Sequence, residues 1–232
     1  MTDLTGQRVL VIGGGKNLGL ALARKAKDLG ATVAIGVRSA QEVADTVGEE
    51  FQIIPLDITD EASIAAAAAE LGTVDHIVST AAAHHNVPVA DLDKAATLTA
   101  FDAKVVGPLL VAKHFDVTGS IVLFSGVAAW RPSPGYAVMG ITNGAVAFAV
   151  SHLAKELAPV RVNAVSPGII DSGTYDAMPA ADRQAFFAGV AEGNLAGRVG
   201  TTDDIVDAVA WLWGAGFVSG ETIHVEGGVR AF

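Results

Sequence analysis

The sequence of residues 8–19 is RVLVIGGGKNLG, in which a short apolar run is followed at once by three glycines. The run predicts a buried β-strand, and the alanine- and leucine-rich residues from about 17 to 29 predict a helix directly after it. Glycine permits a tight turn and a close approach of the backbone to a ligand, while a helix N-terminus offers unpaired N–H groups. The order strand, glycine-rich turn, helix therefore predicts a site for the pyrophosphate of a dinucleotide. A tight turn with only a structural role is the alternative.

The same alternation of strand and helix continues along the whole chain. Strands are expected at residues 8–12, 32–36, 52–55, 76–79, 120–124, 161–165 and 222–225, and helices at about 17–29, 39–46, 59–71, 92–114, 136–157, 179–192 and 202–213. The strands are almost continuously apolar, which is typical of parallel strands covered on both faces. We therefore expect an α/β protein: one doubly wound domain over residues 1–232, with a seven-stranded parallel sheet and helices on both faces.

Composition and charge narrow the classes of partner. The 232 residues include 15 Lys and Arg, 25 Asp and Glu and no cysteine, which gives a formal net charge of -10. This charge argues against a nucleic-acid partner, and the lack of cysteine excludes a disulfide scaffold and a thiolate zinc site. The N-terminus has neither a basic nor an apolar targeting segment. The longest uncharged stretch, residues 132–154, contains prolines and polar residues and predicts a loop that enters a buried helix. We expect a soluble cytoplasmic protein that does not bind a membrane.

Several motifs together resemble the short-chain dehydrogenase/reductase family. Its fingerprint Thr-Gly-x-x-x-Gly-x-Gly corresponds to residues 12–19, with Ile12 in place of the threonine and Asn17 in place of the middle glycine. Asparagine adopts positive φ more readily than most residues, so we expect the turn to survive this change. The resemblance covers essentially the whole chain and implies a Rossmann-like fold with a nicotinamide cofactor. Further matches lie at Asp57 and Ile58 and at residues 74–78, 163–168, 197–205 and 218–228.

The resemblance also implies where the cofactor and the substrate bind. Arg38 stands where an acid would otherwise bind the adenosine ribose, and Lys16 lies in the phosphate turn, so NADP(H) is favoured over NAD(H). A solvated surface charge is the alternative for Arg38. Residues 172–194 have the position of a lid over the substrate, and residues 130–132 are expected at the substrate mouth or at a subunit contact. The expected cofactor-binding residues are Gly13, Gly15, Lys16, Asn17, Leu18, Gly19, Arg38, Asp57, Ile58, Ala81, Ala82, Asn143, Pro167, Gly168, Ile170 and Ser172.

The catalytic pattern of the family is substituted in this sequence. Family members place a Ser, a Tyr and a Lys, with an upstream Asn, around the nicotinamide, and the tyrosine is the general acid/base. Two anchors without gaps, residues 153–158 and residues 125–127, align the tyrosine with Met139 and the lysine with Asn143. The second anchor aligns the serine with Gly126. The resemblance therefore implies a divergent member of the family.

Other residues are candidates to supply the missing chemistry. Tyr136 fails as the start of a Tyr-x-x-x-Lys motif because Gly140 follows four residues later, but it lies about one helical turn before Met139. The neighbours His84 and His85 have no acidic partner at ligand spacing, so we expect no metal site. The catalytic candidates are Tyr136, Ser125, His84 and Lys104, of which the last aligns with the upstream Asn of the family. Packing for the tyrosine, a solvated or structural role for the histidine, and a structural niche for the lysine are the alternatives.

The sequence leaves three functions open. The first is an NADP(H)-dependent oxidoreductase that transfers hydride to or from a small carbonyl or alcohol substrate with an altered proton donor. The second is a non-catalytic NADP(H)-binding or redox-sensing protein, and the third is a lyase or isomerase with a structural cofactor. The resemblance further implies a homodimer or homotetramer assembled through the helices at residues 92–114 and 136–157.

Overall fold

The computed structural model describes residues 2–231 and contains one large parallel sheet. Its strand order is β3-β2-β1-β4-β5-β6-β9, and all neighbouring strands are parallel. The order reverses between β1 and β4, which opens a crevice at the carboxyl ends of these strands, where ligands bind in such sheets. This arrangement confirms the predicted fold class. The strands are β1 (Arg8–Ile12), β2 (Thr32–Val37), β3 (Gln52–Pro55), β4 (Val74–Ser79), β5 (Val117–Phe124), β6 (Arg161–Pro167) and β9 (Thr222–Val225).

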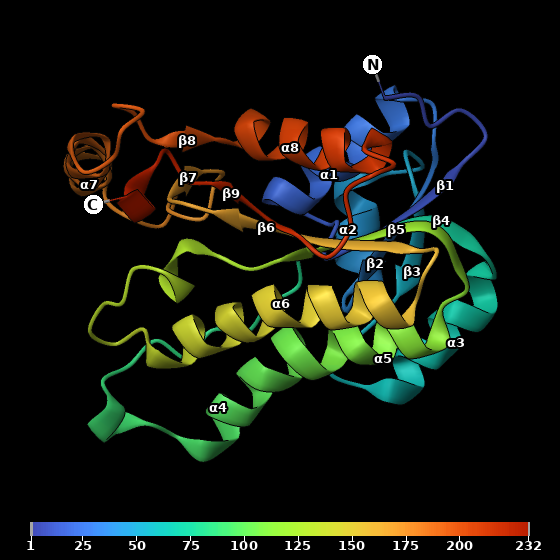
Figure 1. Cartoon of the computed structure of the whole chain (residues 1–232), viewed down its shortest axis with the longest axis horizontal. Coiled ribbons are helices and arrows are strands. Elements are labelled where there is room, and N and C mark those ends of the chain that lie inside the picture. The colour runs from blue at the N-terminus through green and yellow to red at the C-terminus, as the bar shows by residue number, and fades with distance from the viewer. Residues whose placement is uncertain (1, 232) are drawn as a thin grey trace.

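Helices cover both faces of the sheet (Figure 1). One face carries α1 (Asn17–Asp28), α2 (Ala40–Val47) and α8 (Thr202–Gly214), and the other carries α3 (Glu61–Leu71), α4 (Lys94–Phe101), α5 (Gly107–His114) and α6 (Ala137–Glu156). The remaining helix, α7 (Ala180–Glu192), stands beyond the end of the sheet in Figure 1.

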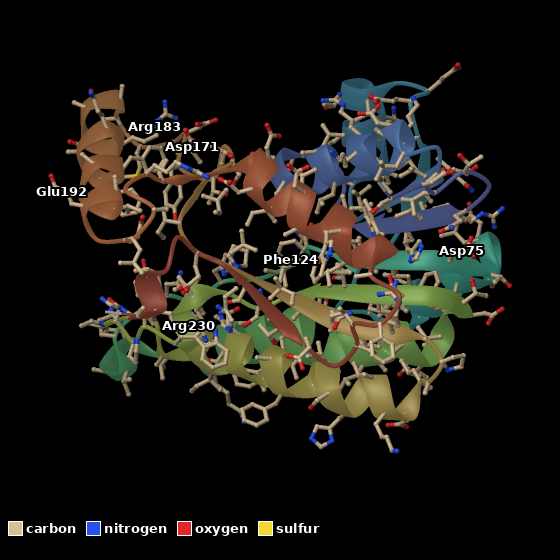
Figure 2. The ribbon with its side chains drawn as sticks, turned by 45° about the horizontal axis from the view of Figure 1, so that its top comes forward. Asp75, Phe124, Asp171, Arg183, Glu192 and Arg230 are labelled. Atoms are coloured by element: carbon tan, nitrogen blue, oxygen red, sulfur yellow. The ribbon has the colours of Figure 1, made fainter. Side chains whose placement is uncertain are left out.

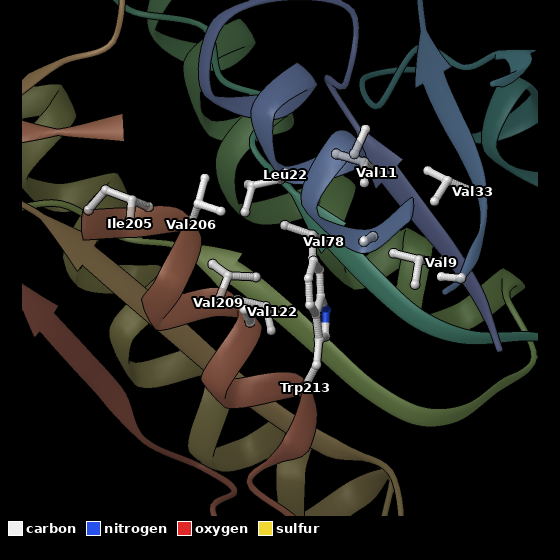
Figure 3. Close-up of a cluster of buried hydrophobic side chains, with 14 of the residues drawn as sticks. Val9, Val11, Leu22, Val33, Val78, Val122, Ile205, Val206, Val209 and Trp213 are labelled. Carbon is white, nitrogen blue, oxygen red and sulfur yellow. The ribbon is translucent and has the colours of Figure 1, made fainter. Parts of the chain in front are cut away.

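Alternate residues of the central strands feed two separate cores. In β1, Val9 and Val11 face the α1 and α8 side, whereas Leu10 and Ile12 face the α3, α5 and α6 side, and all four are at most 1% exposed. Figure 3 shows the first of these cores, with Trp213 of α8 packed among valines of the strands. Burial on both faces explains why the strands are apolar at nearly every position.

Two details of the backbone differ from the sequence expectation. The helix expected at residues 92–114 is interrupted by a π-helical turn at Asp102–Val106, between α4 and α5. Pro108 has no N–H to donate to the carbonyl four residues earlier, which disfavours regular α-helical bonding there. Gly107 also packs against the loop after β3, since a Cβ atom on it would lie 2.4 Å from the Ile58 carbonyl oxygen. The second difference is a short parallel pair, β7 (Ile170–Asp171) with β8 (Gly200–Thr201), which is too short to give a sequence pattern.

Two helical segments, Lys94–His114 and Ala137–Glu156, are long and apolar enough to cross a membrane. Both pack on the sheet, and the fold buries 28% and 33% of their most apolar windows, as in outer helices of a soluble protein. The expectation of a buried helix after residue 132 is therefore wrong for its outer face, where Ile141 and Phe148 are exposed. The reason is that α6 is an outer-layer helix, with only its inner side against the sheet.

Candidate active site

A cavity of about 600 Å³ opens at the carboxyl ends of the central strands. It is enclosed by the loops after β4, β5 and β6, by the first half of α6 and by the π-helical turn. In Figure 2 this end of the molecule carries α7, with Arg183 and Glu192, and the C-terminal turn with Arg230, while Asp75 marks the opposite end. The parallel topology therefore gathers residues from distant parts of the chain around one space.

The glycine-rich turn after β1 forms a tight cradle beside this cavity. Gly13 and Asn17 have φ values of +84° and +47°, so asparagine adopts the left-handed conformation that glycine favours. A Cβ atom on Gly19 would lie 2.2 Å from the carbonyl oxygen of Gly13, which only glycine avoids. Helix α1 begins after Lys16, whose side chain makes no capping hydrogen bond, and its first turn carries no acid. The glycines leave this backbone open to the close approach of a ligand, and the first turn of α1 carries no acid that would repel an anion. Both features fit the pyrophosphate of a dinucleotide.

The carboxyl ends of β2 and β3 bring one cation and one anion together. Arg38 follows β2 and is exposed, and Asp57 follows β3. Burial opposes ionisation of Asp57, but the pKa of its carboxyl is lowered, because Thr59 donates to it through N and Oγ1 at 2.9 and 2.7 Å and Arg38 adds its charge. Asp57 thus stays ionised beside Arg38. An exposed guanidinium here is suited to bind a phosphate on the adenosine ribose.

The turn after β5 and the helix α6 meet at Gly126 and Asn143, two positions that the sequence predicts to be substituted. A Cβ atom on Gly126 would lie 2.7 Å from Nδ2 of Asn143, so the asparagine side chain occupies the space that a larger residue at Gly126 would need. Ser125 Oγ donates to the backbone oxygen of Asn143 at 2.8 Å and ties the end of β5 to α6. Met139 and Asn143 both line the cavity, whereas Gly140 lies in a neighbouring surface groove. Tyr136 also lines the cavity, from the N-cap of α6, and is 43% exposed.

Lys104 reaches the cavity from the π-helical turn. Burial lowers the pKa of its ammonium to about 8. Its Nζ donates to the carbonyl oxygen of Ser125 at a long 3.5 Å, so no strong bond competes for its protons there. Partial burial and then the charge of Lys104 lower the pKa of His84, which keeps that ring neutral at pH 7. Lys104 is therefore a buried cavity group whose pKa lies close enough to neutral pH for it to exchange a proton there.

The two adjacent histidines have different positions. His84 lines the cavity, whereas Nε2 of His85 accepts a hydrogen bond from the backbone N–H of Asp93 at 3.0 Å. His85 therefore holds the loop before α4 and does not face the cavity. Across residues 2–231, no group of three or more metal-ligating side chains is gathered in one place.

The segment at residues 172–194 covers the outer side of the cavity. Ser172, Thr174, Tyr175 and Phe186 line it, and the Tyr175 ring packs against Phe186 at 5.2 Å between centroids. An ion pair between Arg183 and Asp176 joins α7 to the preceding turn. The start of the segment also contacts the phosphate turn, since a Cβ atom on Gly173 would lie 2.9 Å from Oδ1 of Asn17. Part of the segment therefore forms a wall of the cavity, and its role as a lid stays a prediction.

The structure divides the predicted site residues into two groups. One group lines the cavity: Tyr136, Ser125, His84, Lys104, Leu18, Asn143, Pro167, Gly168, Ile170 and Ser172. The other does not line it and lies in the phosphate turn or in the loops after β2, β3 and β4: Gly13, Gly15, Lys16, Asn17, Gly19, Arg38, Asp57, Ile58, Ala81 and Ala82. Their roles stay predictions. Three further residues line the cavity that the sequence did not single out, because they carry no motif: Asn86, Tyr175 and Phe186. Arg131 also lines it, and this residue belongs to the segment 130–132 that was expected at the substrate mouth or at a subunit contact.

Comparison with known proteins places this geometry among oxidoreductases. A family profile described as enoyl-(acyl carrier protein) reductase matches residues 13–230. A cis-4-hydroxycyclohexanecarboxylate dehydrogenase of Sinomonas cyclohexanicum is 32% identical over the full length of both chains. A 1-cyclohexenylcarbonyl-CoA reductase of Streptomyces collinus is 31% identical over 93% of this chain and 82% of its own. The crystal structure of a small-chain dehydrogenase in complex with NADPH superposes with a TM-score of 0.84 at 30% identity, covering 97% of this chain and 99% of that one.

Proposed function

Because the chain belongs to the short-chain dehydrogenase/reductase family, whose members are oxidoreductases that bind nicotinamide cofactors, we propose an NADP(H)-dependent enzyme in which Lys104 moves the proton. Its substrate would be a small carbonyl compound or the corresponding alcohol. The observation that carries this proposal is the cavity-lining lysine with a pKa lowered to about 8, in a site without the usual tyrosine and lysine.

The preference for NADP(H) over NAD(H) rests on charge at the adenosine end. Arg38 is exposed at the carboxyl end of β2, and the sequence from Thr32 to Ser39 offers no acid to repel a 2′-phosphate. Lys16 precedes the first turn of α1 and adds a second cation. The related structure with bound NADPH supports the same choice. Fluorescence titration of the protein with NADPH and NADH tests it, and equal affinities would contradict it.

The bound nicotinamide would supply hydride to a carbonyl carbon, or accept it from an alcohol carbon. The residues of this chain then have to bind the substrate oxygen and move one proton. In the direction of reduction, the Lys104 ammonium donates a hydrogen bond to the carbonyl oxygen and gives its proton as that oxygen becomes an alkoxide. In the direction of oxidation, the neutral amine takes the hydroxyl proton. A pKa near 8 suits both directions close to neutral pH.

The other candidates are less suited to this role. The Ser125 hydroxyl is buried and donates its proton to the Asn143 carbonyl, so it positions the β5 end. The neutral His84 ring lies close enough to Lys104 to feel its charge and can pass protons between the amine and solvent. Tyr136 stands at the cavity mouth, where its ring is suited to contact the substrate.

Substitution of Lys104 tests the proposal directly. Lys104→Met should lower kcat for carbonyl reduction by at least about 100-fold, the range expected for loss of a general acid, while NADPH binding is retained. Lys113→Met is the matched control, because Lys113 lies on the exposed side of α5 and pairs with Glu61. The measurement is NADPH oxidation across a panel of aldehydes and ketones. Full activity in Lys104→Met, or loss of activity only in Tyr136→Phe, would contradict the assignment; tight NADPH binding with no turnover of any substrate would favour the non-catalytic alternative.

We also propose that the protein is a cytoplasmic homo-oligomer. Large apolar side chains stand exposed on the outer face of α4, the π-helical turn, α5 and α6: Leu98, Val106, Leu109, Ile141 and Phe148. Exposed apolar side chains on helices that pack against each other, as α4 and α6 do, are suited to contact a second copy of the chain. Light scattering at micromolar concentration tests this, and Phe148→Lys should shift the mass toward the monomer. A monomeric wild-type protein would contradict it.

A further inference from the structure

Aromatic side chains gather at the cavity. Aromatic residues make up only 6% of the chain and include two tyrosines, yet both of these tyrosines line this one cavity, together with a phenylalanine. Tyr136 is the N-cap residue of α6, Tyr175 precedes α7, and Phe186 belongs to α7 itself. Two separate segments of the chain therefore supply three aromatic rings to the space in which a substrate would bind.

Two of these rings belong to a small aromatic cluster that also contains Phe187. The ring centroids of Tyr175 and Phe186 are 5.2 Å apart, and those of Tyr175 and Phe187 are 5.7 Å apart. All three side chains are half-buried. Tyr175 and Phe186 line the cavity, whereas Phe187 packs within the cluster without lining it. The cluster therefore joins α7 to the preceding turn and leaves two of its rings in contact with the cavity.

The side chain of Met139 is suited to pack against an aromatic ligand. Met139 lines the cavity from the first half of α6, and the apolar residues Val127 and Ala128 line it from the turn after β5. A thioether is polarizable and makes favourable contacts with aromatic rings. A ring in this cavity would therefore meet other rings, a thioether and aliphatic side chains.

The charged side chains at the cavity are already in use. Among residues 2–231, no aspartate or glutamate lines the cavity. Arg131 is engaged within the protein and also lines a second cavity, together with Asp204 and Glu226. Lys104 faces the reacting oxygen in the proposed reaction. A further charged group on the substrate would lose its water without gaining an ionic partner, so the cavity favours a substrate that is neutral.

We infer that the substrate of this enzyme is a neutral aryl ketone or the corresponding alcohol, whose ring packs on Tyr175 and Phe186 while its carbonyl or hydroxyl group faces Lys104. This inference rests on the proposed oxidoreductase function for the reaction itself, but binding of the ring does not depend on turnover. In reduction, the carbonyl carbon receives hydride and the oxygen receives a proton from Lys104. One ketone, one NADPH and one proton then give one alcohol and one NADP⁺.

Benzamide and cyclohexanecarboxamide are suitable binding probes, since both carry a neutral amide on a carbon ring and only the first ring is aromatic. The saturated ring has the larger apolar area, so burial of area alone would favour cyclohexanecarboxamide. We expect the protein to bind benzamide at least about fourfold more tightly, because each aromatic contact contributes about 2- to 10-fold in affinity. Isothermal titration calorimetry measures both dissociation constants, with and without NADPH.

Substitution of Phe186 tests whether its ring causes the preference. Phe186→Leu keeps an apolar side chain and removes the ring, so the ratio of the two affinities should fall at least about twofold. Phe186→Tyr should keep the ratio. Phe187→Leu is the matched control and should also keep it, because Phe187 belongs to the same cluster and does not line the cavity. An equal fall of the ratio in Phe186→Leu and Phe187→Leu would show that the rings only pack α7, and would overturn the inference.

Acetophenone and cyclohexyl methyl ketone test the same preference in turnover. The ratio of their kcat/KM values in Phe186→Leu, divided by the wild-type ratio, is free of their difference in intrinsic reactivity and should be at most about one half. A preference for benzamide that Phe186→Leu loses, without turnover of either ketone, would support the inference and contradict the oxidoreductase. Turnover of both ketones with a ratio that Phe186→Leu leaves unchanged would overturn the inference and leave the oxidoreductase intact. Equal affinity for the two amides, or no binding of either, would overturn the inference as well.

Discussion

The turn after β1 and the turn after β5 lie at the same end of one sheet, but the sequence treats them differently. The first keeps the backbone requirements of a dinucleotide site, with glycine at the close approach of Gly19 to Gly13 and left-handed φ at Asn17. At the second turn, the side chain of Asn143 occupies the space that a residue larger than Gly126 would need. We therefore expect cofactor binding to depend on main-chain geometry at the first turn, and acid/base chemistry to depend on side chains that can be replaced separately.

Gly19→Ala should have the largest effect, because it disturbs the main-chain geometry of the turn after β1. The new Cβ atom would meet the backbone of Gly13, which cannot move without opening the turn. We expect at least about a 100-fold loss of NADPH affinity and a loss of about 1–3 kcal/mol in the free energy of unfolding. Fluorescence titration and urea unfolding measure the two.

Gly189→Ala is the control for that variant. No atom lies within 4 Å of the position of its Cβ, and it sits inside α7, so the change should stabilise the protein by up to about 1 kcal/mol. NADPH binding by Gly19→Ala at wild-type strength would show that the pyrophosphate does not lie on this turn.

Arg38→Asp tests cofactor binding through charge, whereas Gly19→Ala tests it through shape. Loss of the guanidinium and gain of a carboxylate beside Asp57 should lower the affinity for NADPH about 10- to 100-fold and the affinity for NADH far less. Arg24→Asp, on the exposed side of α1, serves as the control. If Arg38→Asp lowered the affinities for both cofactors equally, Arg38 would not bind the 2′-phosphate.

The pH dependence of turnover tests the proposed role of Lys104 as the proton donor. The pKa of Lys104 is lowered to about 8, so the ammonium that reduction requires is present below that pH and is lost above it. At saturating substrate, kcat for reduction should fall about tenfold per pH unit above pH 8, and kcat for alcohol oxidation should rise up to the same pH and then level off. Lys104→Met should show neither inflection in its residual rate. A wild-type profile that is flat across this range would exclude Lys104 as the proton donor.

Gly126→Ser should have the smallest effect, and it tests whether residues 126 and 143 contribute to the free energy of unfolding independently of each other. The Cβ atom would press on the Asn143 amide, which is the end of a side chain and can shift, so we expect a loss of about 1–2 kcal/mol in the free energy of unfolding. Asn143→Ala in the same chain should recover most of this loss. Additive effects in the double variant would show that the two positions are independent.

The sequence predicted the fold well because its evidence is periodic and repeated. Runs such as residues 8–12 and 161–165 are apolar at nearly every position, and this follows from burial on both faces of the sheet. The π-helical turn was not predicted, because it depends on how Gly107 packs against Ile58 and on the missing N–H of Pro108. Contacts between helix and loop of this kind leave no periodic signal.

The candidate site was predicted in outline but not in its interactions. Alignment of motifs brought Met139, Asn143 and Gly126 to one place, but not the contact between the asparagine amide and the glycine. Sequence could not distinguish His84 from His85, because the difference lies in a hydrogen bond from Asp93, eight residues further along the chain. The lowered pKa of Lys104 likewise comes from burial, which depends on the packed structure.

The contact between Gly126 and Asn143 also limits the order in which this sequence can change over evolutionary time. A serine that appears first at residue 126 meets the asparagine amide, and the intermediate protein is less stable than either neighbour in sequence space. A change at residue 143 that comes first removes the obstacle, and the serine then becomes accessible at little cost. The order of the two substitutions therefore matters, because a serine at residue 126 destabilises the protein while Asn143 is present and is tolerated once a smaller residue stands there. A lineage that carries Asn143 would therefore keep Gly126 until residue 143 changes.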